Sequence, residues 1–352
     1  MARMPALFGL AAILSLSRAQ RIGMLLPMLG EILGAEQVSI TLLDGREQVE
    51  AAYFLQPFQP EAWGLYLREF HLQKEREAFG GMQLATLLGA TPVVNITEAY
   101  GSTFYRSALY REVFEPNGGR HLLAAALPWS GRLGGVLMFY RQRGRAFGPK
   151  EEKTVLAMAS PLANMLAEPG VEENIWREDL DGGVLVATTG GNQLYSSQAA
   201  DEALGRMFST HFGGTFYKQP PARRKFFFDA SQRVMSSPRH HGRLVHQNHH
   251  GRFTAAIDTL SGTDPSGLPL LGIHLRSQIP QGVWFARRVA VTSLSPGEQA
   301  VCLLAAQGLD WGQVAQRMNV ERLTVKSYTQ RIYAKLGVSG REEMLARLAE
   351  EP

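Results

Sequence analysis

The hydrophobic pattern of the first half of the chain predicts two β-hairpins among helices. Short runs rich in β-branched and aromatic residues predict two strand pairs, 38–43 with 49–54 and 121–128 with 133–140. Asp44-Gly45 and Ser130-Gly131-Arg132 supply the turns between the paired strands. Apolar residues at helical spacing predict helices at about 10–33, 61–77 and 149–167. Antiparallel strands combined with helices indicate an α+β fold for this block.

A second block begins after Glu168-Pro169-Gly170, because proline and glycine both end helices. Its pattern predicts a hairpin, a short helix and a further strand pair, at 183–187 with 193–196, at 199–206, and at 252–260 with 270–276. Residues 278–291 contain Pro280 and Gly282, and we interpret them as a linker with some order of its own. The second block is therefore also a mixture of strands and helices.

The last part of the chain carries only helical signals. Ser295 caps a first helix, with Glu298 three residues beyond it, and Gly308 ends that helix. Asp310 caps a second helix. Apolar spacing and stop residues predict four helices, at 295–308, 311–318, 322–336 and 341–350. An all-α module thus follows two α+β blocks.

Charge is distributed unevenly along the chain. Over 352 residues the formal net charge is +4, which is mild and does not by itself indicate a nucleic-acid partner. Within 292–352, seven basic residues balance seven acidic ones. The third predicted helix nevertheless contains Arg322, Lys326, Arg331 and Lys335 and no acidic residue. A positive helix on a neutral module favours attraction to phosphates, because that attraction acts locally in salt.

Two helices joined by a short turn, the second longer and basic, have the layout of a helix-turn-helix. The segment closely resembles the LuxR-type DNA-binding domain. The resemblance rests on five motifs: Leu294-Ser295-Pro296-Gly297-Glu298, Ala306-Gln307-Gly308-Leu309, Val314-Ala315-Gln316-Arg317-Met318, Leu323-Thr324-Val325-Lys326-Ser327-Tyr328 and Ile332-Tyr333-Ala334-Lys335-Leu336-Gly337-Val338-Ser339-Gly340-Arg341.

The resemblance implies that the partner is double-stranded DNA and that the third helix contacts it. Lys326, Ser327 and Gln330 would face base edges in the major groove, where sequence is recognised. Thr324 would hold a phosphate at the start of the helix, and the remaining cations would neutralise backbone phosphates. The residues expected to contact DNA are Arg322, Thr324, Lys326, Ser327, Gln330, Arg331 and Lys335.

Three positions depart from the family pattern. A basic residue, a small capping hydroxyl and a histidine are usual where this chain has Gly297, Glu321 and Tyr328. Two of the three lie in or beside the predicted reading helix, so the target sequence is expected to be unusual. The fourth helix provides a dimer contact in this family, which implies a homodimer here, through Met344, Leu345 and Leu348.

The two front blocks resemble sensor domains. The first is similar to a GAF-type domain in Leu33-Gly34-Ala35-Glu36-Gln37-Val38-Ser39-Ile40, Gly134-Gly135-Val136-Leu137 and Phe147-Gly148-Pro149. The second is similar to a PAS-type domain in its opening hairpin and helix. We therefore expect an α+β multidomain chain, with a GAF-like α/β sensor at 1–168, a PAS-like α/β domain at 171–288 and an all-α four-helix LuxR-type helix-turn-helix domain at 289–352.

Aromatic residues of the first block are candidates to line a small-molecule pocket, although such residues more often form plain core. The candidates are Tyr53, Trp63, Phe104, Tyr105 and Trp129. No cofactor is predicted, and the effector is unknown. In the second block, Arg223-Arg224-Lys225 beside Phe226-Phe227-Phe228 favours a helix with a buried aromatic face over a contact with nucleic acid.

A histidine cluster raises the possibility of metal binding, because imidazole is a common metal ligand. Neighbouring arginines repel a cation, however, and the only obvious acid nearby is Asp258. We therefore favour a cationic, solvated loop and predict no metal site. The alternative is metal or pH sensing by His240, His241, His246, His249 and His250.

Several functions are disfavoured by what the sequence lacks. The single cysteine, Cys302, excludes an intramolecular disulfide. No phosphate-binding glycine loop, nucleophile elbow or His-Glu-x-x-His motif is evident, and no apolar run is long enough to span a membrane. We expect a cytoplasmic, non-enzymatic bacterial transcription regulator whose front domains respond to a small molecule or partner. Metal or pH sensing, and constitutive DNA binding with the front domains as a scaffold, are the alternatives.

Overall fold

A computed structural model describes residues 16–167, 175–208, 211–213, 223–237 and 241–350. The chain forms two compact units, one made of Ile22–Ala167 with Leu180–Gln278 and the other centred on Ile279–Pro352. The mixture of helices with antiparallel sheets in the first unit, and the helical end of the chain, confirm the α+β prediction. No helix among the described residues is long and apolar enough to cross a membrane.

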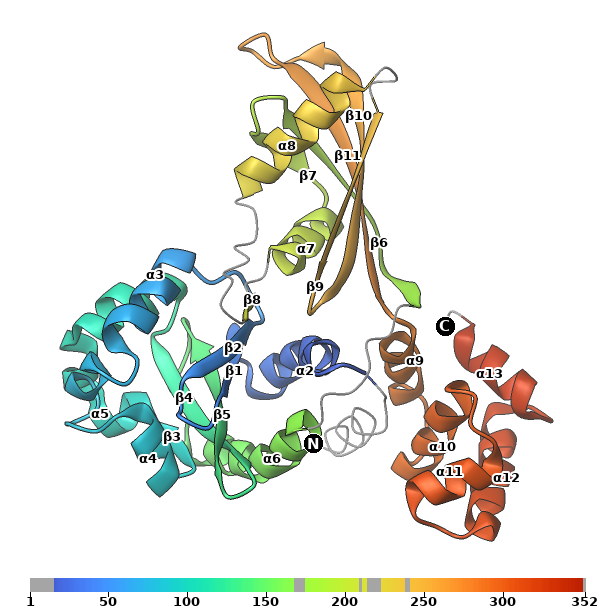
Figure 1. Cartoon of the computed structure of the whole chain (residues 1–352). Helices are drawn as coiled ribbons and strands as arrows, with labels where there is room; N and C mark the ends of the chain where they lie inside the picture. The colour runs from blue at the N-terminus through green and yellow to red at the C-terminus, as the bar shows by residue number, and fades with distance from the viewer. Residues whose placement is uncertain (1–15, 168–174, 209–210, 214–222, 238–240, 351–352) are drawn as a thin grey trace. The chain divides into compact units, whose positions relative to one another are not determined.

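The first sheet confirms both predicted hairpins of the front block (Figure 1). Its strand order is β3-β4-β5-β1-β2-β8, and every described pairing in it is antiparallel. The strands are β1 (Gln37–Leu43), β2 (Val49–Phe54), β3 (Val93–Asn95), β4 (His121–Trp129), β5 (Arg132–Arg141) and β8 (His211–Gly213). The central strands are buried along almost their whole length, because helices cover both faces of the sheet.

Helices α2 and α6 lie on one face of this sheet, and α3, α4 and α5 lie on the other (Figure 1). Their bounds are α2 (Arg18–Leu33), α3 (Pro60–Leu65), α4 (Leu84–Ala90), α5 (Ile96–Arg106) and α6 (Pro149–Ala167). The helix predicted over 61–77 is interrupted: a π-helical turn at Tyr66–Phe70 follows α3, and a 3₁₀ turn at Lys74–Glu77 comes after Leu72, whose φ is 56°. A left-handed residue cannot continue a right-handed helix.

The second sheet has the order β7-β6-β11-β10-β9 and also carries the predicted strand pairs. Its elements are β6 (Trp176–Thr188), β7 (Gln193–Ser196), α7 (Gln198–Met207), α8 (Arg223–Ser236), β9 (His241–Asn248), β10 (Gly251–Thr263) and β11 (Pro269–Pro280). Phe226 and Phe227 are buried in the core beside this sheet, which confirms the predicted aromatic face of α8 for these two residues, whereas Phe228 is exposed.

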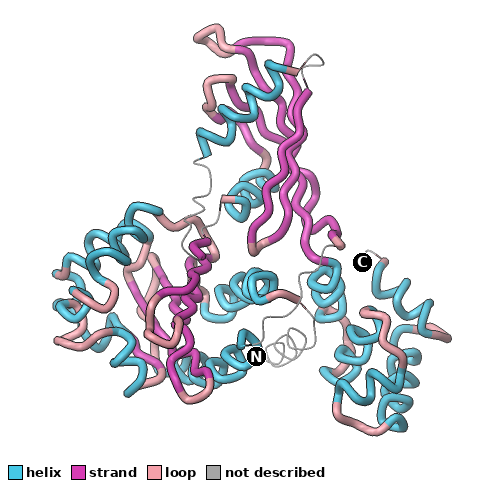
Figure 2. Tube along the Cα trace, viewed as in Figure 1, coloured by secondary structure: helices cyan, strands magenta, loops and turns pink. Residues whose placement is uncertain are grey.

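Within the described residues 281–350, the elements of regular structure are all helices (Figure 2). They are α9 (Gln281–Ala290), α10 (Pro296–Ala306), α11 (Trp311–Met318), α12 (Arg322–Leu336) and α13 (Arg341–Ala349), so the four predicted helices of this region are confirmed. The linker predicted over 278–291 is wrong, because Pro280 ends β11 and caps a regular helix. Val283, Ala286 and Val289 of α9 are buried at helical spacing, and that burial stabilises a segment whose glycine and proline suggested a linker.

Candidate nucleic-acid interface

Two capping motifs fix where the helices before the reading helix begin. Asp310 accepts hydrogen bonds from the amides of Gly312 and Gln313 at 2.7 and 2.9 Å, and the Gln313 side chain accepts one from the Asp310 amide at 2.9 Å. This is a capping box, and Ser295 with Glu298 forms another at α10. Asn319 ends α11 in the left-handed conformation, with φ 52°. The turn between α11 and α12 is therefore short and sharply defined.

One side of α12 is anchored in the domain and the other is exposed. Val325, Thr329 and Ile332 are buried against the other helices of the unit. The predicted contact residues lie elsewhere on the helix. The exposed ones are Arg322, Lys326, Gln330, Arg331 and Lys335, and the partly buried ones are Thr324 and Ser327. The structure thus brings all seven together on one helix, with an exposed surface that is polar and basic.

Lys335 has a partner inside the domain. Its Nζ lies 2.7 Å from Oε2 of Glu298, whose side chain is only 2% exposed, whereas that of Lys335 is 38% exposed. Burial acts to raise the pKa of Glu298, but hydrogen bonds from Lys335 and from the Ser295 amide hold that pKa below its usual value. The carboxylate therefore stays charged at neutral pH. Lys335 ties α12 to the start of α10, a structural role that the sequence prediction of a phosphate contact did not include.

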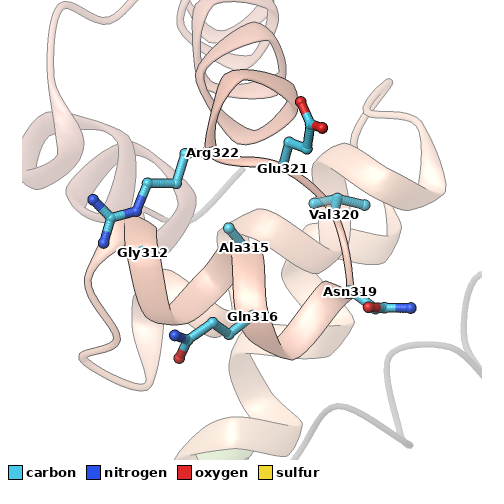
Figure 3. A pocket seen from close by; sticks show the side chains of 7 residues that line it. All are labelled: Gly312, Ala315, Gln316, Asn319, Val320, Glu321 and Arg322. Carbon is cyan, nitrogen blue, oxygen red and sulfur yellow. The ribbon is translucent and has the colours of Figure 1, made fainter.

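Arg322 borders an open hollow beside the helix-turn-helix turn (Figure 3). Its side chain extends toward Gly312 at the start of α11, where a Cβ atom on Gly312 would lie 2.5 Å from a guanidinium nitrogen. The hollow has a volume of about 530 Å³. Its lining residues are Gly312, Ala315, Gln316, Asn319, Val320, Glu321 and Arg322. A glycine in the first turn of α11 therefore leaves space for a cation beside the turn.

Two of the three departures from the family pattern touch each other. A Cβ atom at Gly297 would lie 2.9 Å from the Cζ and hydroxyl oxygen of Tyr328, so the phenol ring occupies the space next to the glycine. The guanidinium of Arg331 lies 5.5 Å from the centre of the same ring and donates a hydrogen bond to Ser327. The tyrosine at 328, where a histidine is usual, therefore packs into space that the side chain of a basic residue at 297 would otherwise occupy. The third departure, Glu321, makes no side-chain capping bond to α12.

The fourth helix packs within the unit. Met344 is completely buried, with its sulfur 3.9 Å from that of Cys302, and Leu348 is 5% exposed. The carbonyl of Leu348 accepts a hydrogen bond from Arg288 of α9 at 3.0 Å. The predicted dimer contact through Met344 and Leu348 is therefore wrong, because both side chains contribute to the core of their own domain. Leu345 is the partly exposed member of the predicted set.

The aromatic residues predicted to line a ligand pocket are mostly core. Tyr53, Trp63 and Phe104 are buried, and Phe104 packs in an aromatic cluster. Tyr105 donates to the carbonyl of Arg120 at 2.8 Å, and the indole of Trp129 donates to that of Ala163 at 2.7 Å. The polar atoms of Tyr105 and Trp129 are thus satisfied by backbone carbonyls. The many aromatic residues of this block mainly fill the hydrophobic core between the first sheet and its helices.

A small cavity in the same block is lined by different residues. It measures about 40 Å³ and combines the apolar side chains of Leu43, Val49, Leu84, Ala85, Val136 and Met138 with the polar ones of Thr41, Tyr66, His71 and Glu75. Glu75 is 1% exposed and accepts hydrogen bonds from Tyr66 and from the amide of Leu84, both at 3.2 Å. Tyr66 also lies 3.3 Å from Nδ1 of His71. Sequence analysis missed this group because its residues lie in the interrupted stretch that reads as one helix.

Burial governs the ionisation of this polar cluster. It raises the pKa of Glu75 to about 6 and lowers that of His71, so both groups are biased toward their neutral forms. A carboxyl that titrates near neutral pH responds strongly to any new charge or hydrogen bond placed beside it. The protonation state of Glu75 would therefore depend on the molecule that occupies the cavity.

The histidine cluster occupies a hairpin, so the predicted solvated loop is wrong for the described members. His241 and His246 lie in β9, and His249 and His250 form the turn to β10. His240 lies outside the described residues. His241 lies 2.7 Å from Asp258 on the neighbouring strand. Among the described residues, no three histidine, cysteine or acidic side chains are grouped as metal ligands would be.

Comparisons with known proteins address both ends of the chain. No curated protein matches the chain. A GAF domain of a phosphoenolpyruvate-protein phosphotransferase from Coxiella burnetii is similar at 18% identity, with 47% of this chain and 94% of that chain covered and a TM-score of 0.34. VqmA from Vibrio cholera, in a complex with ligand and DNA, is similar at 17% identity, with 49% of this chain and 82% of that chain covered and a TM-score of 0.22.

The C-terminal helices give the specific match. Residues 292–348 match the family model described as "Bacterial regulatory proteins, luxR family". This range begins just before the cap of α10 and extends through nearly all of α13, so it contains the two capping boxes, the turn at Asn319 and the whole of α12. The C-terminal domain of this chain is a LuxR-type helix-turn-helix domain.

Proposed function

We propose that the chain is a cytoplasmic, non-enzymatic transcription regulator in which α12 enters the major groove of double-stranded DNA and the front unit responds to an effector. The observation that carries the proposal is the two-sided character of α12. Its apolar side is anchored by Val325 and Ile332, and its other side exposes cations and hydrogen-bonding side chains. A helix held in this way can place polar side chains against base edges.

The roles proposed for the individual residues follow from their surroundings. Lys326 and Gln330 are exposed on the reading side of α12 and would contact bases. Arg322, beside the hollow at the turn, would neutralise a backbone phosphate there. Arg331, held by Ser327 and Tyr328, would contact the backbone farther along the helix. Binding as a homodimer to two half-sites would account for recognition of a sequence longer than one helix can read.

The test of DNA binding is an operator titration with the full chain at fixed salt. A preferred duplex is first selected from a random pool, and wild type is compared with Lys326→Ala. We expect the variant to lose about 1–3 kcal/mol of discrimination between the selected duplex and a random one. Lys153→Ala, which removes an exposed lysine from α6, is the charge-matched control. Unchanged discrimination by Lys326→Ala would contradict the assignment.

For the front unit, we propose that an effector's polar group is recognised in the cavity at Glu75. The polar residues of its wall are Thr41, Tyr66, His71 and Glu75, and the other lining residues are apolar. A hydrogen-bond donor or a protonated amine would stabilise the ionised form of Glu75, whose pKa burial raises to about 6. The small volume of about 40 Å³ limits what enters to a head group of a few atoms.

Ligand released by denaturing the purified full chain tests this part of the proposal. Mass spectrometry should detect a small molecule in preparations of wild type and of Glu77→Gln, an exposed control on the same 3₁₀ turn. Glu75→Gln should contain much less of it. Equal occupancy in the two variants would argue against recognition by Glu75.

A further inference from the structure

An apolar side chain stands out in the polar surface of α12. Leu323 is 73% exposed, although leucine is normally buried, and it lies in the first turn of the helix. Its neighbours in sequence are Arg322, at the hollow beside the turn, and Thr324. An isolated exposed leucine on an ordinary surface would need no explanation. Its position within the proposed reading surface is what makes this one informative.

Helix geometry places Leu323 on the same side as the proposed base-reading residues. Lys326, Ser327 and Gln330 follow it at intervals of three, four and seven residues, and these intervals return to one face of a helix with about 3.6 residues per turn. The buried residues Val325 and Ile332 lie on the other side. Leu323 is therefore the N-terminal member of a row of four on the exposed face.

The surroundings of Leu323 indicate what its side chain would contact. The cations of α12 form a basic surface around it, which attracts a polyanion and disfavours burial against an apolar protein partner. In the major groove the one prominent apolar group on a base edge is the C5-methyl group of thymine. The N-terminal residues of a recognition helix are also those that reach base edges in helix-turn-helix complexes.

We propose that Leu323 is a specificity-determining residue that selects a thymine by packing on its C5-methyl group. The inference rests on the proposed DNA-binding function and adds a contact to the set assigned from the family resemblance. The methyl group and the leucine carbons would leave water together, whereas cytosine has only a hydrogen atom at C5 and offers no methyl group for this contact. Leu323 thus discriminates by apolar contact where Lys326 and Gln330 would do so by hydrogen bonds.

The experiment removes the methyl group and the side chain separately. A preferred duplex is selected with the full chain, and each thymine in it is replaced in turn by deoxyuridine, which lacks only the methyl group. Affinities are measured for wild type, for Leu323→Ala and for the control Val291→Ala, which trims an equally exposed apolar residue outside the helix-turn-helix. Leucine and alanine are both strong helix formers, so Leu323→Ala keeps α12 intact.

We expect one thymine in each half-site at which deoxyuridine weakens binding by wild type and by Val291→Ala about three- to fivefold, the effect of one buried methyl group. Leu323→Ala should bind both duplexes equally. The same deoxyuridine penalty in Leu323→Ala as in wild type, or a selected half-site without thymine, would overturn the inference and leave the proposed function standing. Selection of no preferred sequence at all would overturn both.

Discussion

Replacing Lys335 by methionine tests whether α12 is held by an ion pair with the core of its own domain. Methionine keeps most of the length of the side chain and is also a good helix former, so the substitution removes mainly the ammonium group. The carboxylate of Glu298, 2% exposed, then loses the partner that lies 2.7 Å away. It keeps the hydrogen bond from the Ser295 amide at 2.7 Å. The result is a buried charge with part of its stabilisation removed.

The size of the effect follows from burial. Removing one partner of a fully buried pair costs about 3–5 kcal/mol. Lys335 is 38% exposed, so water already screens the pair, and we expect a loss of about 2 kcal/mol in the free energy that keeps α12 packed. Because about 1.4 kcal/mol corresponds to a factor of ten, opening of α12 should become roughly 30-fold more frequent.

Hydrogen–deuterium exchange on the full chain measures this locally, over peptides within 322–336. Lys326→Met is the matched control, since Lys326 lies on the exposed side of the same helix and makes no ion pair in the described part of the chain. We expect faster exchange in Lys335→Met and wild-type exchange in Lys326→Met. Equal protection in the two variants would refute the reasoning and return Lys335 to a simple role in phosphate binding.

Three further predictions concern the same domain. The pKa of Glu298 lies below its usual 4.5 in the folded state, so its stabilising effect is present above that value and is lost as pH falls through the folded pKa. The protection of α12 amides, expressed relative to the intrinsic exchange rate at each pH, should therefore fall on acidification below about pH 4.5 in wild type and fall less in Glu298→Gln. Glu321→Ser should supply the missing cap and stabilise the first turn of α12 by about 1 kcal/mol, measured as slower hydrogen exchange there. Unchanged exchange would mean that the serine does not cap the helix. Gly297→Ala should displace the Tyr328 ring and change operator affinity in wild type but not in a Tyr328→Ala background, and additive effects in the double variant would contradict this coupling.

Local sequence signals determined much of this structure. Turn residues such as Asp44-Gly45 and caps such as Ser295 and Asp310 act within a few residues, so the hairpins and the four C-terminal helices are predictable from the sequence. The LuxR-type domain is predictable for the same reason, because its motifs combine caps, stops and helical spacing in one short segment. Where a signal was local and strong, the structure followed it.

Contacts between distant residues decided the rest. Burial of Val283 and Val289 turned the predicted linker into α9, although Gly282 and Pro280 opposed it locally. The pairing of Lys335 with Glu298 joins residues 37 positions apart, so the charge pattern of α12 could suggest only a phosphate contact. Glu75 reaches Tyr66 only because the chain between them leaves the α-helical path. Each of these outcomes depends on the free energy gained when residues distant in sequence are buried against one another. That free energy cannot be read from the sequence of one segment alone.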